Sequence, residues 1–315
     1  MNLDSVPNQA AYEPLDEVVR KARTDYGASA SSVLVIHNDR IVYEQYHGFH
    51  HHKGGAVPVT KSSMFNIYST RKTYISCAMA MAALDNGVPI STPVAEVLSD
   101  YPGEDLGQLT LCDLATASGP KFFHDMQWER EGIQGQVVRA LSGKSIAAFL
   151  EERVLKPLSC KETIWATAPT ASLVCDYATN PAYATNPAYA TVRLESHEGH
   201  ERNMYTSTRD LAKWGYLHLK RGSAGGRQLI SAAFYRLSDE LKAMNPNRRI
   251  LGWYHRSDWF YATGAAGCHV VVYPEHQAVG VRMLNKYTSR YEDDQNLFNN
   301  ALLQCLKQAG STVVL

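Results

Sequence analysis

Strand-like segments occur near both ends of this chain of 315 residues, and helical segments occupy most of its middle. The run SSVLVIHNDRIVYEQYHG holds two β-rich stretches around Asn38-Asp39, whose side chains tolerate the left-handed backbone of a hairpin turn. From about residue 250 the runs ILGWYHR, WFYATG, CHVVVYPE and QAVGVRML are again typical of strands. This order predicts an α+β fold, an α/β sandwich in which N- and C-terminal strands form one antiparallel sheet flanked by helices, with a mostly helical region inserted.

The same pattern predicts how the chain divides. We expect residues 1–65 and 225–315 to form the sheet region and residues 66–224 a mostly helical region, with a ligand cleft between them. Helices are expected over about residues 15–26 and in LFNNALLQCLKQ near the end of the chain. The tandem repeat TNPAYATNPAYAT contains two Asn-Pro steps, which exclude a regular helix, so it is expected to be a loop over the surface or the cleft.

Charge and composition exclude several classes of partner. Lys and Arg number 31, as do Asp and Glu, so the chain lacks the basic excess of a nucleic-acid-binding protein. No apolar stretch approaches the ~20 residues of a membrane-spanning helix. The polar start, which carries Asp4, does not resemble a secretory signal, so a cytoplasmic protein is expected. The six scattered cysteines fit reduced thiols.

Neither a metal nor a cofactor is expected. Three consecutive imidazoles, His50-His51-His52, do not converge on one ion in regular backbone, so we interpret them as a solvated loop. His197 and His200 lack the helical spacing of a zinc motif and are also expected at the surface.

The segment FNIYSTRK carries the chemistry that we predict. Ser69 lies where an irregular segment enters a helix, expected from Thr70 to about Asn86, that is apolar all round and therefore buried. Free backbone N–H groups at a helix start favour negative charge. Lys72 follows three residues later on the same helical face, and desolvation in a cleft lowers a lysine pKa until the amine can accept a serine proton. Arg71 points off that face and is expected to make structural contacts.

Six segments in order resemble the serine β-lactamase-like and penicillin-binding-protein-like family, which includes class C β-lactamases, esterases and 6-aminohexanoate-oligomer hydrolases. They are VPVTKSSMFNIYSTRK, LDNGVPISTPVAEVLSDYP, LTLCDLATASGP, SGKSIAAFLEERVLKPLSCKET, MYTSTRDLAKWGYLHLKRG and YATGAAGCHVVVYPE. The resemblance covers about residues 31–274. It implies the β-lactamase/transpeptidase-like fold, with Ser69 as the nucleophile and Lys72 as its activating partner.

The chain departs from the family at the second motif, a Tyr-x-Asn whose tyrosine is, or supports, the general base. The two ways of aligning this region place Met126 or Arg130 at the tyrosine position. Lys72 acting alone is one explanation, and loss of hydrolysis is another. A substitute base is a third explanation, and the candidates are His124, Glu129, Arg130, Glu131, Tyr205 and a tyrosine of the TNPAYA segment.

The third motif differs too. Ala262-Thr263-Gly264 keeps the Thr-Gly of the family but lacks the cation that meets a substrate carboxylate in penicillin-directed enzymes. We therefore expect weak or absent β-lactamase activity. The resemblance assigns oxyanion and substrate binding to the segment formed by Thr263, Gly264, Ala265 and Ala266.

The leading hypothesis is a cofactor-independent serine hydrolase, an esterase or amidase that forms an acyl-enzyme on a small, mostly apolar ester or amide. An acyltransferase that uses the same acyl-enzyme is the nearest alternative. A non-catalytic binding protein on a decayed scaffold is the alternative from another class. The sequence leaves a homo-oligomer open.

Overall fold

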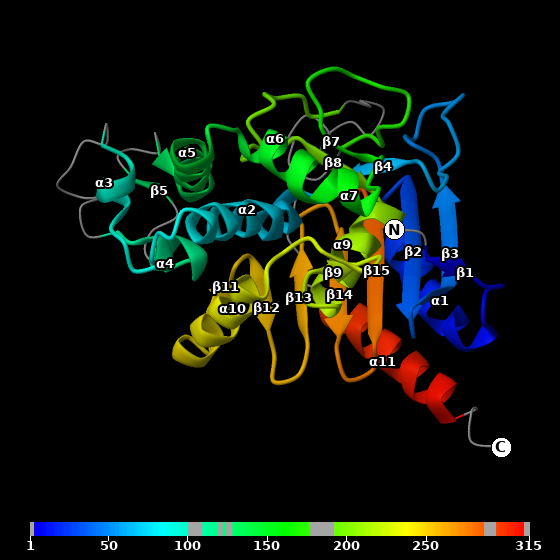
Figure 1. Ribbon diagram of the computed structural model, residues 1–315. Helices are drawn as coiled ribbons and strands as arrows, with labels where there is room; N and C mark the ends of the chain where they lie inside the picture. Colours follow the sequence, from blue (N-terminus) through cyan, green and yellow to red (C-terminus); the bar gives the residue numbers. More distant parts are fainter. Residues whose placement is uncertain are drawn as a thin grey trace.

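The computed structural model describes residues 3–99, 109–118, 122–123, 128–176, 192–286 and 294–311. Its centre is an eight-stranded sheet in the order β1-β3-β2-β15-β14-β13-β12-β11 (Figure 1). Every neighbouring pair is antiparallel except β1 and β3. The strands are β1 (Asp4–Ser5), β2 (Ala30–His37), β3 (Arg40–Gly48), β11 (Arg249–Ile250), β12 (Trp253–His255), β13 (Phe260–Thr263), β14 (His269–Tyr273) and β15 (Ala278–Leu284).

The first and last parts of the chain meet at the centre of this sheet. β2 pairs with β15 from Ser31 opposite Leu284 to His37 opposite Ala278. Asn38 and Asp39 adopt φ of 49° and 66° in the turn between β2 and β3. The predicted hairpin, and the predicted sheet built from N- and C-terminal strands, are therefore confirmed.

Helices cover both faces of the sheet. On one face, α1 (Glu13–Asp25) and α11 (Gln295–Ser311) pack through Leu15, Phe298 and Leu302 onto Val33 and Val271. On the other face, α9 (Thr208–Leu219) packs on β2, β14 and β15, and α2 (Lys72–Asp85) belongs to the same hydrophobic core. Residues 73–83 of α2 are all buried, as its apolar sequence predicts.

The remaining elements surround α2 or extend from the sheet. A three-stranded sheet has the order β4-β8-β7, and two short strand pairs, β9 with β10 and β5 with β6, complete the strands. Their bounds are β4 (Met64–Asn66), β5 (Phe122–Phe123), β6 (Trp128–Glu129), β7 (Thr163–Trp165), β8 (Met204–Ser207), β9 (Ser223–Ala224) and β10 (Arg227–Gln228). The α-helices are α3 (Val94–Val97), α4 (Leu111–Ala115), α5 (Arg130–Ser142), α6 (Ile146–Leu150), α7 (Lys156–Leu158) and α10 (Ala232–Met244), and the other helical turns are η1 (Ala10–Tyr12), η2 (Tyr68–Arg71) and η3 (Glu151–Leu155).

Two expectations are not decided by this fold. The division at residues 65 and 225 stays a prediction. The TNPAYA repeat lies in 177–191, outside the described residues. None of the helices in the described part of the chain is long and apolar enough to span a membrane.

Candidate active site

Ser69 lies in a tight helical turn at the entrance of the buried helix. Strand β4 ends at Asn66, η2 begins at Tyr68, and α2 continues from Lys72 without a break. Ser69 is partly exposed, while its neighbours Tyr68 and Thr70 are buried. Neither its N–H nor its Oγ makes a hydrogen bond to the described part of the chain. The serine therefore presents a donor and a hydroxyl that are both available to a ligand.

Lys72 contacts a carboxylate rather than the serine. Its Nζ lies 3.1 Å from Oε1 of Glu131, which is the second residue of α5. The Lys72 side chain is 15% exposed and that of Glu131 2%, so the pair is well shielded from water. The backbone N–H of Lys72 donates to the Ser69 carbonyl, but among the described residues no hydrogen bond joins the Lys72 amine to the Ser69 hydroxyl. Such contacts are often long before substrate binds, so this geometry does not disqualify the pair.

Burial and neighbouring charges control the ionisation of this pair. Desolvation lowers the pKa of Lys72 to about 8, against the opposing effect of the Glu131 carboxylate. Burial by itself would raise the pKa of Glu131, but the Lys72 ammonium and the Arg71 guanidinium hold it well below its ordinary value. Glu131 is therefore a carboxylate at neutral pH, and Lys72 titrates close to neutrality.

Three arginines accompany the pair. Arg71 is buried and donates from Nε to the carbonyl of His200 and from Nη1 to that of Tyr68, so its predicted structural role is confirmed. Arg130 begins α5 beside Glu131, and burial lowers its pKa. The charge of Arg249, on β11, contributes to lowering the pKa of Lys72.

A tight turn brings the edge of the sheet against the lysine. Gly252 connects β11 to β12 with φ +84°, and a Cβ there would lie 2.5 Å from the backbone of Lys72. Only a glycine fits this close approach. This contact explains why Arg249, on the edge strand β11, lies near Lys72 at the start of α2.

The end of β13 lies against the serine turn. A Cβ on Gly264 would lie 2.2 Å from the carbonyl oxygen of Ile67 and 3.2 Å from Cβ of Tyr68. The N–H of Gly264 donates to the carbonyl of Cys268 over 2.8 Å and so is occupied. Within the described residues the N–H of Ala265 donates no hydrogen bond. Ala265 directly follows the glycine that packs against the serine turn, and its open N–H makes it the candidate donor of the predicted oxyanion segment.

The neighbouring members of that segment are less suited to this role. Thr263 ends β13, where it pairs with His269 of β14. The N–H of Ala266 also makes no hydrogen bond within the described residues, but its carbonyl accepts from Lys286, which ties it to the end of β15. Ala262, where the family has a cation, is buried in the core.

The structure gives the proposed substitute bases different partners, and only some of them lie at the Lys72 site. Arg202 binds the Glu129 carboxylate over 2.6 Å, so Glu129 is engaged elsewhere. Tyr205 is fully buried in β8, and its hydroxyl accepts the N–H of Arg193 over 2.8 Å. His124 lies outside the described residues. Only Glu131 contacts Lys72 among the candidates that the structure describes, and the sequence offers no local signal for that contact because it joins two helices.

The triple-histidine segment differs from its interpretation as a solvated loop. His50 is buried, and its Nε2 lies 2.7 Å from Oγ of Ser63, while the backbone of Ala171 supplies a second hydrogen bond, so the imidazole is satisfied in the interior. His51 is partly exposed and His52 exposed. In the described ranges, no group of three or more His, Cys, Asp and Glu side chains is arranged to hold a metal ion.

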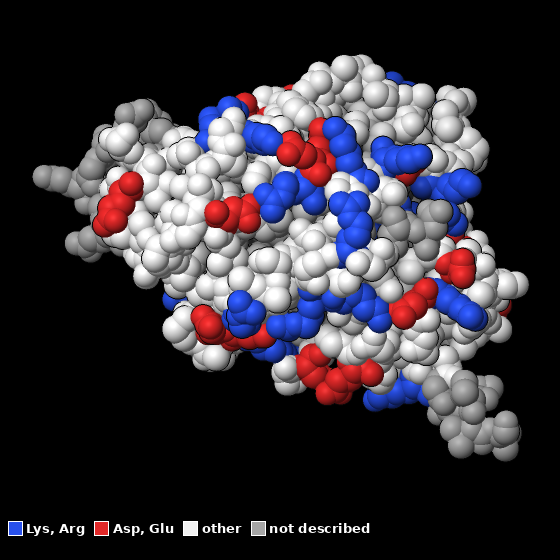
Figure 2. All heavy atoms as spheres, in the orientation of Figure 1, with Lys and Arg blue, Asp and Glu red and all other residues white. Residues whose placement is uncertain are grey.

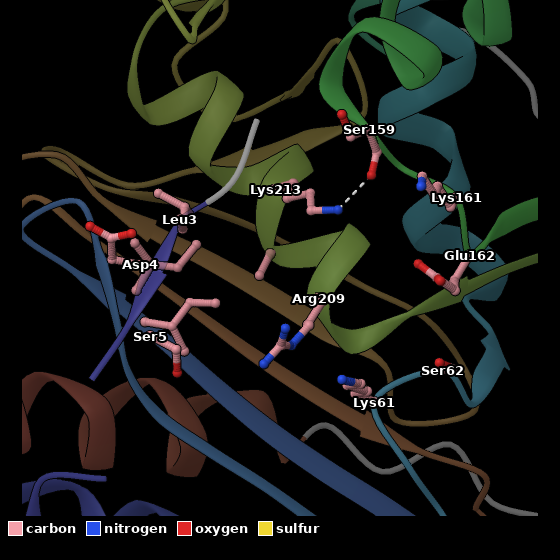
Figure 3. Close-up of a pocket in the computed structure, with 13 residues that line it drawn as sticks. Leu3, Asp4, Ser5, Lys61, Ser62, Ser159, Lys161, Glu162, Arg209 and Lys213 are labelled. Atoms are coloured by element: carbon pink, nitrogen blue, oxygen red, sulfur yellow. Dashed lines mark hydrogen bonds between the residues drawn. The ribbon is translucent and has the colours of Figure 1, made fainter. Parts of the chain in front are cut away.

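A separate cavity of about 490 Å³ lies beside β1 and α9 (Figure 3). Its walls include Arg209 and Lys213 but not Ser69. These two cations are paired, since Arg209 binds the Glu44 carboxylate over 2.6 Å and Lys213 binds that of Asp210 over 2.8 Å. The other lining cations, Lys61 and Lys161, are matched in number by Asp4 and Glu162, so the cavity carries no excess charge that marks an anion site. On the face drawn in Figure 2, basic and acidic side chains are likewise interspersed.

The fold and this site define a class: a mixed helix-and-sheet protein in which a serine and a lysine share the first turns of a buried helix beside a sheet edge. The beta-lactamase family model matches residues 15–127 and 131–304. The chain therefore belongs to the beta-lactamase family, and family and fold together indicate a serine hydrolase of the beta-lactamase type.

Relatives and solved structures agree with this assignment. An uncharacterized protein of Alkalihalophilus pseudofirmus is 29% identical over 325 residues, which cover 91% of this chain and 94% of that protein. A class C beta-lactamase superposes with a TM-score of 0.71 at 15% identity, covering 96% of this chain and 98% of its own. The class C beta lactamase of Rhodobacter sphaeroides gives 0.70 at 18% identity, covering 94% and 99%. At such identities the likeness shows the shared fold.

Proposed function

We propose that this protein is a serine esterase or amidase that forms an acyl-enzyme on Ser69 of a small, mostly apolar substrate. The observation that carries the proposal is the buried contact between Lys72 and Glu131, one helical turn from the serine. It supplies a titrating amine and an orienting carboxylate in a region where the tyrosine of the family is missing. A decayed site has no chemical need to keep Ser69 and Lys72 together at the start of the buried helix.

In the proposed acylation, the neutral amine of Lys72 takes the proton of the Ser69 hydroxyl as Oγ attacks the substrate carbonyl. The N–H groups of Ser69 and Ala265 hold the oxyanion, because both are open and the two segments pack together. The ammonium of Lys72 then returns the proton to the departing alcohol or amine, and the C–O or C–N bond breaks. Glu131 stays ionised throughout and holds the amine in place.

In the proposed deacylation, water takes the position of the leaving group. Lys72 accepts a proton from this water as its oxygen attacks the acyl carbon, and the same two N–H groups hold the second oxyanion. The ester bond to Ser69 Oγ breaks, and the proton passes from Lys72 to that oxygen. The free carboxylic acid leaves, and the enzyme returns to its starting state.

The test is the intact mass of the protein after incubation with a fluorophosphonate, alongside turnover of a series of p-nitrophenyl esters. The proposal predicts one phosphonate adduct on the wild-type protein and none on Ser69→Ala. It also predicts ester turnover that disappears in the same variant. A folded wild-type protein that takes no adduct and turns over no ester would contradict the proposal and favour a binding protein on this scaffold.

A further inference from the structure

The residue before the proposed nucleophile has an unusual backbone. Tyr68 adopts φ +45°, in the left-handed region that L residues other than glycine seldom occupy. It is neither a glycine nor an asparagine, so its own chemistry does not favour this conformation. Such backbone strain persists only where surrounding contacts over-determine it, and it gathers at functional sites.

Contacts from three directions hold Tyr68 in this conformation. Its N–H donates to Oδ1 of Asn66 over 2.9 Å, and its carbonyl accepts from Nη1 of Arg71 over 3.2 Å. Its phenol donates a hydrogen bond to the carboxylate of Asp176. Gly264 closes the remaining side, because the end of β13 packs against Cβ of Tyr68.

The phenol contact is the long-range hydrogen bond of this set. Asp176 is distant in sequence and is itself buried, with 8% of its surface exposed. The backbone of its neighbour Cys175 is fixed in turn, since its N–H donates to the carbonyl of His50 and its carbonyl accepts from Nδ2 of Asn285. Asp176 is therefore a firm anchor for the ring.

The position of Tyr68 in the chain gives these contacts a consequence for chemistry. The φ and ψ of residue 68 orient the peptide plane that carries the Ser69 N–H. That N–H is one of the two proposed oxyanion donors, and it makes no hydrogen bond within the described residues. An oxyanion donor is effective only when it is aimed beforehand at the site of the developing charge. Relaxation of Tyr68 to an ordinary φ would turn the donor away.

We propose that Asp176 is a positioning residue of the Ser69 site, which acts through the Tyr68 phenol to hold the serine N–H toward the oxyanion. This inference rests on the proposed function and deepens it. Asp176 does not touch the reacting atoms. It is a residue that neither the family motifs nor local sequence patterns single out.

The experiment measures the rate of fluorophosphonate modification and the kcat and KM for a p-nitrophenyl ester in Tyr68→Phe, Asp176→Asn and Asp176→Ala. Removing one oxyanion-hole donor typically costs about 10²–10³ in kcat. Misaiming one should cost less, and we expect roughly a tenfold to hundredfold loss in kcat and in modification rate, with KM within about threefold. Asp176→Asn keeps an acceptor and should recover part of the loss seen in Asp176→Ala.

Tyr273→Phe is the matched control. Tyr273 is also a buried tyrosine, and its phenol donates to the carbonyl of Asn299 over 3.1 Å beneath α11. Loss of the Tyr273 hydroxyl should lower thermal stability about as much as loss of the Tyr68 hydroxyl does, and it should leave kcat unchanged. A purely structural role for Asp176 predicts equal losses of stability in both variants with no selective loss of kcat.

The outcomes separate the two proposals. Modification of wild-type protein together with unchanged rates in folded Tyr68→Phe and Asp176→Asn would overturn the positioning role and leave the serine hydrolase intact. No modification of the wild-type protein would overturn both. Rates are normalised to the folded fraction from circular dichroism. Tyr68→Phe, which removes one oxygen atom, keeps the test decisive if an Asp176 variant folds poorly.

Discussion

Nζ of Lys72 lies 3.1 Å from Oε1 of Glu131, so the first residue of α2 and the second residue of α5 form a buried ion pair beside the serine turn. The pair holds the lysine between two opposing influences. Burial and Arg249 favour the neutral amine, and the Glu131 carboxylate favours the ammonium ion. The pH at which the proposed base becomes active is therefore set by these neighbours.

The pH dependence of acylation should follow the ionisation of Lys72. The neutral amine accepts the serine proton, so the rate should rise with pH and level off above an apparent pKa of about 8. Glu131→Gln removes the charge that favours the ammonium ion, so the pKa of Lys72 falls and the rising limb moves to lower pH. The measurement is the rate of fluorophosphonate modification between pH 5 and pH 10. A pH–rate profile that shifts to higher pH in Glu131→Gln would contradict the assignment of Lys72 as the base.

Arg249→Gln should shift the same limb in the opposite direction. The arginine charge disfavours the ammonium ion of Lys72, so its removal raises the pKa of the lysine and makes the enzyme slower at neutral pH. Arg256→Gln is the control. Arg256 lies in the connection between β12 and β13, where its guanidinium packs over the rings of Trp259 and Tyr261. Equal shifts in both variants would mean that the effect is general electrostatics and not the neighbourhood of Lys72.

The buried pair should show strong coupling in thermodynamic stability. Lys72→Met alone leaves the buried Glu131 carboxylate without its contacting cation and should lower the free energy of unfolding by roughly 3 kcal/mol. Lys72→Met combined with Glu131→Leu removes both charges and should recover most of that loss, while remaining inactive. Chemical denaturation of the wild-type protein, both single variants and the double variant measures the coupling. Additive losses in the two single variants would show no energetic coupling between Lys72 and Glu131, so the ion pair would contribute nothing to the free energy of unfolding.

Gly264→Ala tests the contact between β13 and the serine turn. The new Cβ would lie 2.2 Å from the carbonyl of Ile67, so one of the two segments has to move. We expect roughly a tenfold or greater loss of ester turnover, because the Ala265 donor moves away from the serine. Gly54→Ala is the control, since a Cβ there meets nothing within 4 Å. Unchanged turnover in Gly264→Ala would remove the 264–266 segment from the proposed site.

β-Lactams should be poor substrates. Ala262 is buried and supplies no cation for a substrate carboxylate, and a hydrogen bond to a charged group contributes about 1.5–3 kcal/mol. Nitrocefin turnover should therefore be at least roughly tenfold slower than turnover of a neutral p-nitrophenyl ester. Comparable rates for the two substrates would show that another cation meets the carboxylate.

The features that the sequence predicts correctly depend on short-range chemistry. Asn38-Asp39 predicts its hairpin because two adjacent side chains tolerate the required backbone, and α2 is predicted buried because it is apolar on every face. The proximity of Ser69 and Lys72 follows from three-residue spacing in a helix.

The partners of these residues were not predictable in the same way. Glu131 is one of several acidic residues in its region, and only the packing of α5 on α2 selects it over Glu129. Asp176 reaches Tyr68 across the fold, and no periodicity in either segment signals that contact. His50 was expected in a solvated loop because three consecutive imidazoles do not converge on one metal ion, yet hydrogen bonds to Ser63 and to the backbone of Ala171 satisfy it in the interior.

The pairing of β2 with β15 also bears on how the molecule is made. Ser31 faces Leu284, so the centre of the sheet joins the beginning of the chain to its end. Contacts between residues so far apart in sequence are entropically costly to form and usually slow folding. During synthesis β2 has only β3 beside it until the last part of the chain leaves the ribosome. Because Ala265 emerges with those late strands, a nascent chain carries the serine long before it holds the second proposed oxyanion donor.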